Sequence, residues 1–173
     1  MPGKQQQRPL LPVPRLATAD VCDAMGDAVQ VVALPFSDYG GRLDFAGPVA
    51  TVRTLDDNSF VKSMLETPGE DRVLVVDGGG SLRSALVGGN LADLGVKNGW
   101  AGILVHGCVR DAHELIAADI GVKALGLYPK KSEKLGRGET GVAVTIGGVI
   151  IEPGMWLTAD KDGVVVTKSI PSL

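Results

Sequence analysis

The chain has 173 residues, of which 45% are hydrophobic, 21% are charged and 4% are aromatic, and its formal net charge at pH 7 is −3. This length predicts one domain with a mainly aliphatic core, and the composition excludes disorder along the whole chain. The lack of a basic stripe excludes direct nucleic-acid binding, and no segment has the roughly 18 consecutive apolar residues that a membrane span needs.

The N-terminal segment, "MPGKQQQRPLLPVPRL", carries proline and glutamine where a secretory signal needs an apolar run. We therefore interpret residues 1–16 as a flexible extension and residues 17–173 as one α/β domain. Cys22 and Cys108 lack metal-binding spacing, which favours a reduced interior over a disulfide scaffold. Together these features predict a cytoplasmic protein.

Three elements are expected before residue 68. "TADVCDAM" (residues 18–25) predicts a short helix with Thr18 as a candidate cap. "PVATVRTL" (residues 48–55) predicts a strand, and "NSFVKSMLET" (residues 58–67) predicts a helix that Pro68 and Gly69 end.

Strands and helices then alternate. "RVLVVDGGG" (residues 72–80) is a continuous apolar run ending in three glycines, which is typical of a strand covered on both faces. Asn90 is a candidate cap for the helix that follows it. The further elements, in order, are a helix over 90–98, a strand over 101–107, a helix over 111–118 and a strand over 122–129. This alternation implies parallel strands joined by right-handed crossovers.

From residue 141 the pattern changes to short β-branched runs separated by Gly147-Gly148, Pro153-Gly154 and Asp162-Gly163. Such pairs are typical of hairpin turns, so we expect antiparallel strands packed beside the parallel layer. The predicted fold class is therefore α/β, one compact domain with a parallel βαβ core and C-terminal β-hairpins.

Two glycine-rich loops are candidate binding sites. Gly78, Gly79 and Gly80 follow a strand, but the third glycine of a dinucleotide fingerprint is missing, so a close backbone approach explains them better. Gly88 and Gly89 lie where a helix is expected to begin. Unpaired N–H groups there would face an anion at the positive end of the helix dipole, although an ordinary helix start is the alternative.

Arg110 and Asp111 directly follow the buried "ILVHG" strand, at the sheet edge where open α/β folds bind ligands. Arg110 offers a planar fork for a carboxylate, and Asp111 offers a hard oxygen ligand for Mg²⁺ or Mn²⁺. Together they predict a site for a metal-chelating 2-oxo acid. The alternative is that Asp111 and Glu114 only begin a helix as a capping box, while Arg110 forms a surface ion pair.

The order of Gly89, twenty residues, Arg110-Asp111, two residues and Glu114 resembles the G-x20-R-D-x2-[E/D] motif of one superfamily. That superfamily contains the regulator of ribonuclease E activity A (RraA) and the class II 4-hydroxy-4-methyl-2-oxoglutarate aldolases. The further stretches that resemble it are "FSDYGGRLDFAGPV", "LDDN", "RVLVVDGGGSLRSALVGGN", "NGWAGILVHGCVRD", "DIGVKALG", "KKSEKLGRGE" and "ADKDGVVV".

The resemblance implies a swivelling β/β/α fold, a homotrimer with clefts between subunits, and a divalent metal. It implies that Asp111 binds the metal and that Glu114 acts through a metal-bound water. It assigns substrate binding to Gly88, Gly89, Asn90, Leu91 and Arg110.

The implied activity is metal-dependent cleavage of 4-hydroxy-4-methyl-2-oxoglutarate to pyruvate, with oxaloacetate decarboxylation through the same pyruvate enolate; Arg110 and Asp111 are the catalytic residues. The alternative is a non-catalytic regulator that binds and inhibits ribonuclease E. Because some regulators lack the aspartate after the arginine, Asp111 favours the enzyme. The resemblance identifies no acid or base that a neighbouring subunit contributes.

The remaining candidates have simpler explanations. His106 is expected to be a hydrogen-bonded core residue, His113 to be exposed, and Cys108 to be buried without a base. Trp100 and Trp156 are expected in the core or between subunits. The lysines of a charged run favour a solvated loop over a Schiff-base site: Lys130, Lys131 and Lys134.

Overall fold

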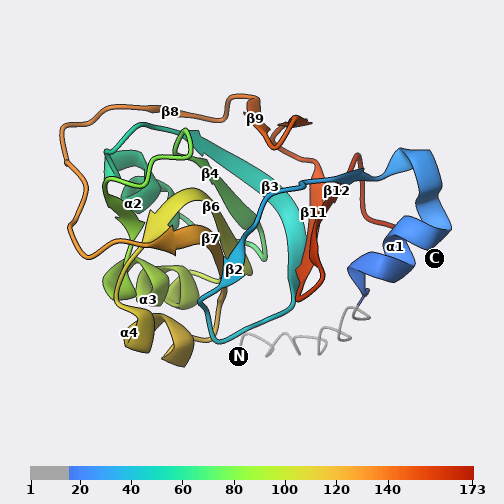
Figure 1. Ribbon diagram of the computed structural model, residues 1–173, viewed down its shortest axis with the longest axis horizontal. Coiled ribbons are helices and arrows are strands. Elements are labelled where there is room, and N and C mark those ends of the chain that lie inside the picture. Colours follow the sequence, from blue (N-terminus) through green and yellow to red (C-terminus); the bar gives the residue numbers. More distant parts are fainter. Residues whose placement is uncertain (1–15) are drawn as a thin grey trace, which may run out of the picture.

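The computed structural model describes residues 16–173, and its centre is a sheet of four parallel strands (Figure 1). In spatial order they are β3 (Phe45–Arg53), β4 (Val73–Asp77), β6 (Gly102–Val109) and β7 (Gly121–Leu127). The predicted parallel core is thereby confirmed. Apart from Leu16, the predicted extension over residues 1–16 lies outside the described residues.

The strands of this sheet are buried on both faces, which is why their sequences are continuously apolar rather than alternating. On β6, Ile103 and Val105 pack toward the helices, whereas Leu104 packs toward the opposite core. The helices covering the first face are α2 (Ser59–Leu65), α3 (Gly89–Lys97) and α4 (Ala112–Ala117). Each fully buried aliphatic side chain stabilises this arrangement by roughly 1.5–3 kcal/mol.

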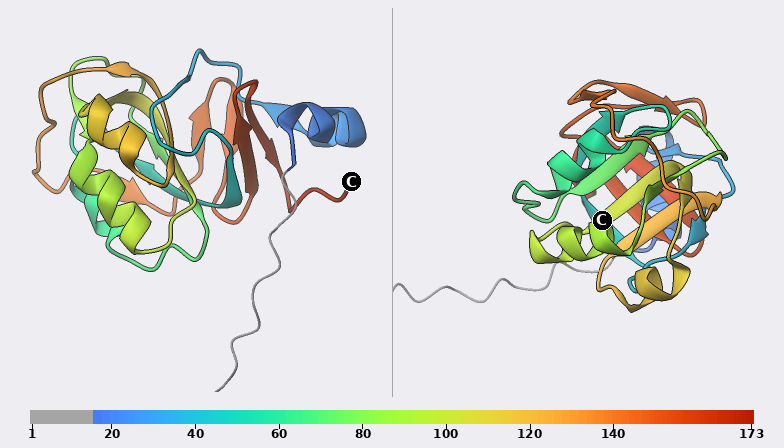
Figure 2. Two further views of the ribbon diagram at one scale, coloured as in Figure 1. Left: turned by 90° about the horizontal axis from the view of Figure 1, so that it is seen from below. Right: turned by 90° about the vertical axis from the view of Figure 1, so that its left-hand side faces the viewer.

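The second face is covered by the C-terminal hairpins, as predicted. β9 (Val144–Ile146) and β10 (Val149–Ile151) pair through Gly147 and Gly148, whose positive φ angles of 58° and 76° suit a two-residue hairpin turn. β11 (Trp156–Asp160) and β12 (Gly163–Thr167) form the second hairpin, and β11 also pairs with β3. The helices therefore lie on one side of the parallel strands and the hairpins on the other, with the β11–β12 hairpin continuing the sheet from β3 (Figure 2).

Several short elements have no clear sequence signal. They are η1 (Gly26–Ala28), β1 (Gln30–Val31), β2 (Ser37–Asp38), β5 (Ala85–Val87) and β8 (Glu139–Thr140). All the strands among them add to the main sheet, and the predicted α/β fold class is confirmed. Within residues 16–173, no helix is long and apolar enough to cross a membrane.

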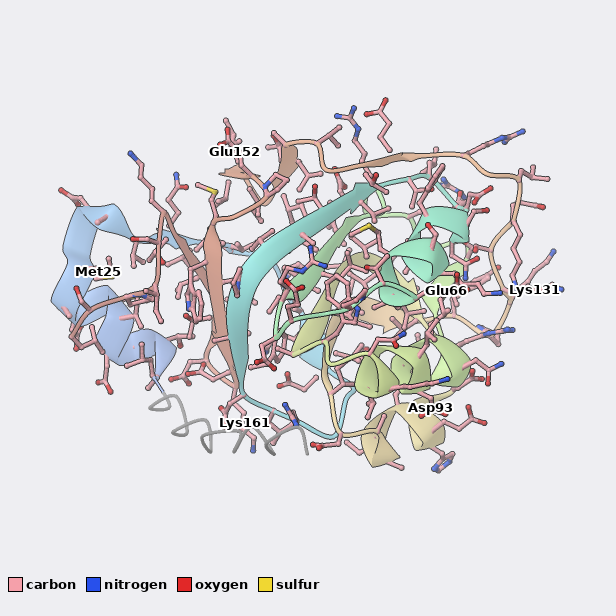
Figure 3. The ribbon with its side chains drawn as sticks, turned by 180° about the vertical axis from the view of Figure 1, so that it is seen from behind. Met25, Glu66, Asp93, Lys131, Glu152 and Lys161 are labelled. Carbon is pink, nitrogen blue, oxygen red and sulfur yellow. The ribbon has the colours of Figure 1, made fainter. Side chains whose placement is uncertain are left out.

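The chain between β7 and β8 runs along one edge of the molecule as a strap, residues 128–138 (Figure 1). Tyr128 donates its backbone N–H to Val109, and the strap then lies beside β5, where Ser132 donates to Ala85. The three lysines of this run are exposed, as predicted, and Lys131 lies at the far end of the molecule from Met25 (Figure 3). The strap is nevertheless tied down by its backbone.

The N-terminal helix α1 (Thr18–Met25) has the predicted bounds, but the predicted cap is wrong. Ala17 occupies the cap position, and the Thr18 hydroxyl and backbone N–H both donate to the Asp160 carboxylate at 2.8 Å. Asp160 also accepts from the N–H of Asp162 at 2.9 Å. A buried carboxylate at the end of β11 therefore holds the first turn of α1 against the sheet.

We predict that Asp160→Asn lowers the free energy of unfolding by about 1–3 kcal/mol at pH 7, because amide replaces a charged acceptor of several hydrogen bonds. Burial by itself raises the pKa of Asp160, but hydrogen bonds from Thr18, Asp162 and Gly163 lower it overall. A lowered folded-state pKa stabilises the protein above the ordinary carboxyl pKa of about 4, and this stabilisation is lost as pH falls through the folded-state value.

Denaturant unfolding of both proteins between pH 7 and pH 3 measures this difference. The gap between wild type and Asp160→Asn should shrink in acid, and a gap independent of pH would contradict the role given to the carboxylate.

Candidate active site

The candidate site lies where β6 ends and β5 takes the place of β4 beside it. Asp77, the last residue of β4, is level with His106, whereas Ala85 and Val87 of β5 are level with Cys108 and Val109. Because β5 runs directly into α3, this change of neighbour brings the start of α3 beside the end of β6. The two segments singled out in the sequence therefore meet at the carboxyl rim of the sheet.

Asp111 links the two segments through its side chain. Its backbone has left-handed angles, φ 63° and ψ 50°, and its Oδ2 accepts a hydrogen bond from the Gly89 N–H at 2.9 Å. Asp111 does occupy the position before α4, but its side chain makes no capping bond there, so the capping-box alternative is wrong. The carboxylate instead faces the first turn of α3, where the helix dipole favours negative charge.

Gly88 and Gly89 are glycines because side chains from α4 and its approach fill the space beside them. A Cβ on Gly88 would lie 2.6 Å from Asp111 Oδ2, and a Cβ on Gly89 would lie 2.8 Å from the Glu114 Cβ and overlap its carboxylate. Two acidic side chains thus lie against the start of α3, and any larger residue there would displace them.

Helix α3 begins where the sequence predicted a helix, but its cap residue is not the predicted one. Gly88, not Asn90, is the cap residue, and Asn90 is an exposed helical residue. Leu91 packs its side chain into the core, so only its backbone can face a ligand. The N–H groups of residues 89–91 have no acceptor within their own helix, and Asp111 uses that of Gly89.

Arg110 lies beside this turn and is half-buried. Its backbone N–H donates to Val87 at 3.0 Å, and its Nη1 makes a long 3.4 Å contact with the carbonyl of Pro129 in the strap. Within residues 16–173 its guanidinium forms no ion pair, so the surface-pair alternative is not observed. The fork therefore retains donors for a carboxylate ligand.

The residues present fit a hard, oxygen-binding ion such as Mg²⁺ or Mn²⁺ better than an ion that needs nitrogen or sulfur ligands. No group of three or more His, Cys, Asp or Glu side chains able to hold a metal occurs among the described residues. Magnesium binds through one or two protein carboxylates and keeps several waters, and Asp111 with Glu114 nearby matches that pattern. Asp111 Oδ2 is anchored by Gly89, which fixes the direction of the carboxylate.

The other glycine loop has no amides to offer a cofactor. The N–H groups of Gly78 and Gly80 both donate to the backbone carbonyl of His106, and the N–H of Gly79 donates to the Asp77 carboxylate. His106 Nδ1 lies 3.3 Å from Asp77 Oδ1, so this histidine is largely enclosed and has a polar partner, as predicted. The close-approach explanation is confirmed for Gly78, where a Cβ would lie 2.8 Å from the His106 carbonyl oxygen, whereas Gly79 and Gly80 have positive φ angles of 67° and 72°.

Two further side chains are not suited to catalysis at the corner. Burial raises the pKa of the Cys108 thiol, which disfavours a thiolate nucleophile. Lys123 was not foreseen as a buried lysine: its side chain is 2% exposed, and its Nζ lies 3.0 Å from Asp38 Oδ1. It is level with Leu104, six residues before Arg110, which places it roughly 20 Å along the strand.

The fold and this corner define a single-domain α/β protein that presents a guanidinium, a restrained carboxylate and helix N–H groups at the rim of its sheet. The chain belongs to the RraA-like family, described as Aldolase/RraA, whose profile matches residues 18–166. The family resemblance stated from the sequence is thereby confirmed.

Individual relatives carry three different descriptions. A protein from Alkalilimnicola ehrlichii described as "Putative 4-hydroxy-4-methyl-2-oxoglutarate aldolase" is 56% identical over 152 residues, covering 88% of this chain and 94% of the relative. The structure of the RNA-processing inhibitor RraA from Thermus thermophilis is 46% identical with a TM-score of 0.88, covering 91% of this chain and 95% of that one. A structure from Geobacillus kaustophilus, described as an S-adenosylmethionine:2-dimethylmenaquinone methyltransferase, is 48% identical with a TM-score of 0.88, covering 90% and 96% respectively.

We predict that Gly89→Ala pushes α4 and Glu114 away from α3 and destabilises the protein by about 1–3 kcal/mol, as overpacking does. Thermal unfolding measures this effect. Gly126→Ala is the matched control, because a Cβ there meets only the Cys108 sulfur at an ordinary 3.8 Å. Equal stability of the two variants would show that the contact between Gly89 and Glu114 is not tight.

Proposed function

We propose that the protein is a divalent-metal-dependent lyase that cleaves 4-hydroxy-4-methyl-2-oxoglutarate to pyruvate and also decarboxylates oxaloacetate. The observation that carries this proposal is the hydrogen bond from the Gly89 N–H to Asp111, which holds a carboxylate beside the Arg110 guanidinium, a group without an ion pair within residues 16–173. Two relatives that are 56% and 53% identical to this chain are described as putative aldolases of this substrate, which supports the proposal.

Substrate binding falls to Arg110 and the start of α3. The planar fork of Arg110 can pair with the C1 carboxylate of a 2-oxo acid through two parallel hydrogen bonds. The N–H groups of Asn90 and Leu91 can donate to the same anion, since helix starts bind anions through unpaired amides. This arrangement favours a small acid that carries its carboxylate next to a keto group.

The metal would be Mg²⁺ or Mn²⁺, held by Asp111 and by a water that Glu114 accepts from. When bound, such an ion supplies Lewis-acid polarisation of the keto oxygen. The Gly89 amide keeps the Asp111 carboxylate aimed, and Gly88 leaves room for it.

Both reactions break a bond to C3 and leave an electron pair on the pyruvate unit as an enolate. In aldol cleavage the C4 hydroxyl loses its proton and becomes a carbonyl, whereas in decarboxylation CO₂ departs; C3 then takes up a proton in either case. Arg110 and the positive end of α3 stabilise the charge that develops on the keto oxygen, which accelerates both reactions. We propose that a homotrimer completes the walls of this site.

A Schiff-base lysine is the mechanistic rival. Lys123 is the buried lysine among the described residues, and its pairing with Asp38 on β2 and its distance from Arg110 disfavour it. Sodium borohydride in the presence of oxaloacetate should therefore leave the protein unmodified, as intact mass spectrometry would show.

A regulator of ribonuclease E is the second candidate function, favoured by the likeness to the Thermus RNA-processing inhibitor. An acidic protein in the cytoplasm can attract arginine-rich disordered segments electrostatically. A pull-down of ribonuclease E with this protein tests that role directly, and the two functions can coexist.

We predict that Asp111→Asn lowers metal-dependent pyruvate release from oxaloacetate at least about 100-fold, because the metal loses its charged ligand. Asparagine retains an acceptor for the Gly89 N–H and tolerates left-handed backbone angles, so the fold should be kept. Coupled pyruvate assays with and without Mg²⁺ or EDTA measure the loss. Turnover that survives EDTA in wild type would refute the metal proposal.

We predict that Arg110→Lys raises KM and lowers kcat together, each by about tenfold, because a point charge cannot replace a two-pronged fork. Steady-state kinetics with oxaloacetate and 4-hydroxy-4-methyl-2-oxoglutarate separate the two constants. A change confined to KM would limit Arg110 to ground-state binding.

A further inference from the structure

Asp56, Asp57 and Asn58 are the last three residues of the connection between β3 and α2, and together they contact both chain segments that flank the Arg110–Asp111 corner. One segment is β5 with the loop before it, and the other is the strap. The mechanism above uses none of these three side chains, although "LDDN" is one of the stretches that resembles the family.

Asn58 holds the β5 side of the corner. Its side-chain Nδ2 donates to the carbonyl of Leu86 at 3.2 Å. The next residue, Val87, accepts the backbone N–H of Arg110 at 3.0 Å, and Gly89 then bonds to Asp111. Asn58 therefore fixes β5, the short strand whose position sets where Arg110 and Asp111 lie.

Asp57 holds the strap side. Asp57 is only 1% exposed. Its carboxylate accepts hydrogen bonds from the N–H of Leu135 at 2.6 Å and from the N–H of Ser59 at 2.9 Å. Burial by itself raises the pKa of Asp57, but hydrogen bonds from Ser59, Leu135 and Arg137 lower it overall. An ionised Asp57 thus ties the strap to the start of α2.

The strap matters to the site because Arg110 rests against it. The Pro129 carbonyl, on the strap, accepts from Arg110 Nη1, and the Glu133 N–H and carbonyl bond to Asp56 and Asn58. Asp56 also accepts from Ser81 and Ser84, which fastens the loop that precedes β5. The two neighbours of the guanidinium, β5 and the strap, are therefore both held by the same three consecutive residues.

We propose that Asn58 and Asp57 are positioning residues of the active corner, which act through β5 and the strap to set the spacing between Arg110, Asp111 and the first turn of α3. A displacement of about 1 Å in such a constellation can cost about 100-fold in rate. The kinetic part of this inference rests on the proposed function, whereas the structural part does not.

Asn58→Ala tests the β5 side, with Asn98→Ala as the matched control. Asn98 makes the same kind of bond, from Nδ2 to the carbonyl of Leu65 at 2.8 Å, but at the far end of α3. Both variants should melt at similarly reduced temperatures. Only Asn58→Ala should accelerate hydrogen–deuterium exchange in residues 86–91 and lower kcat/KM for oxaloacetate, by about 10- to 100-fold.

Asp57→Asn tests the strap side, with Asp160→Asn as its control, because both aspartates are buried and accept backbone N–H groups. Asp57→Asn should raise KM more than it lowers kcat, since Arg110 loses its support, whereas Asp160→Asn should change neither. Exchange in residues 128–138 should rise only in Asp57→Asn.

The proposal would be overturned if residues 86–91 of Asn58→Ala exchanged hydrogen as slowly as they do in the wild type. It would also be overturned if each variant and its control lost the same activity. A wild-type protein without pyruvate release from either substrate would instead refute the proposed function. The exchange comparison would still decide whether Asn58 and Asp57 hold the corner, so the two failures are distinguishable.

Discussion

The hydrogen bond from the Gly89 amide to the Asp111 carboxylate is the contact on which the candidate site depends. It joins the start of α3 to the end of β6, and it requires a left-handed backbone at Asp111, which costs a non-glycine residue roughly 1 kcal/mol or more. The glycines at 88 and 89 are needed because Asp111 and Glu114 fill their side-chain space. Left-handed backbone also occurs at Asp56, Glu70 and Asp71, so at Asp111 it is the combination with the carboxylate contact to Gly89 that marks a candidate site.

The core was predictable because its signals are local. Continuous apolar runs predicted β4 and β6, and glycine-containing turn pairs predicted the C-terminal hairpins. The structure has these strands and hairpins. β5 was missed because a run of three residues after a glycine-rich loop is too short to show a hydrophobic period. Contacts with the strap and with Asn58 hold β5 in place, rather than the strand propensity of its residues. The strands β1, β2 and β8, with two residues each, were missed for the same reason.

The sequence singled out the residues that meet at this corner, but not the contacts between them. The spacing of Asp111 and Glu114 resembled a cap for α4, yet the Asp111 carboxylate turns to α3, a contact that no local pattern encodes. The same applies to Thr18, which bonds to Asp160 from the other end of the sequence. The acceptor role of Asp57 has no local signal either, because its partner, the Leu135 N–H, lies 78 residues further along the chain, in the strap.

Charge balance offers an independent reason for a cation in this corner. Asp111 and Glu114 contribute two negative charges and Arg110 one positive charge, so the side chains carry a net negative charge. A substrate with two carboxylates would be repelled by that arrangement, although water screens part of the repulsion because Asp111 and Glu114 are exposed. The dipole of α3 offsets only about half a charge, whereas a divalent ion offsets two. Under the proposed function, a divalent ion at Asp111 would offset this repulsion and would let the corner accept a dianionic 2-oxo acid.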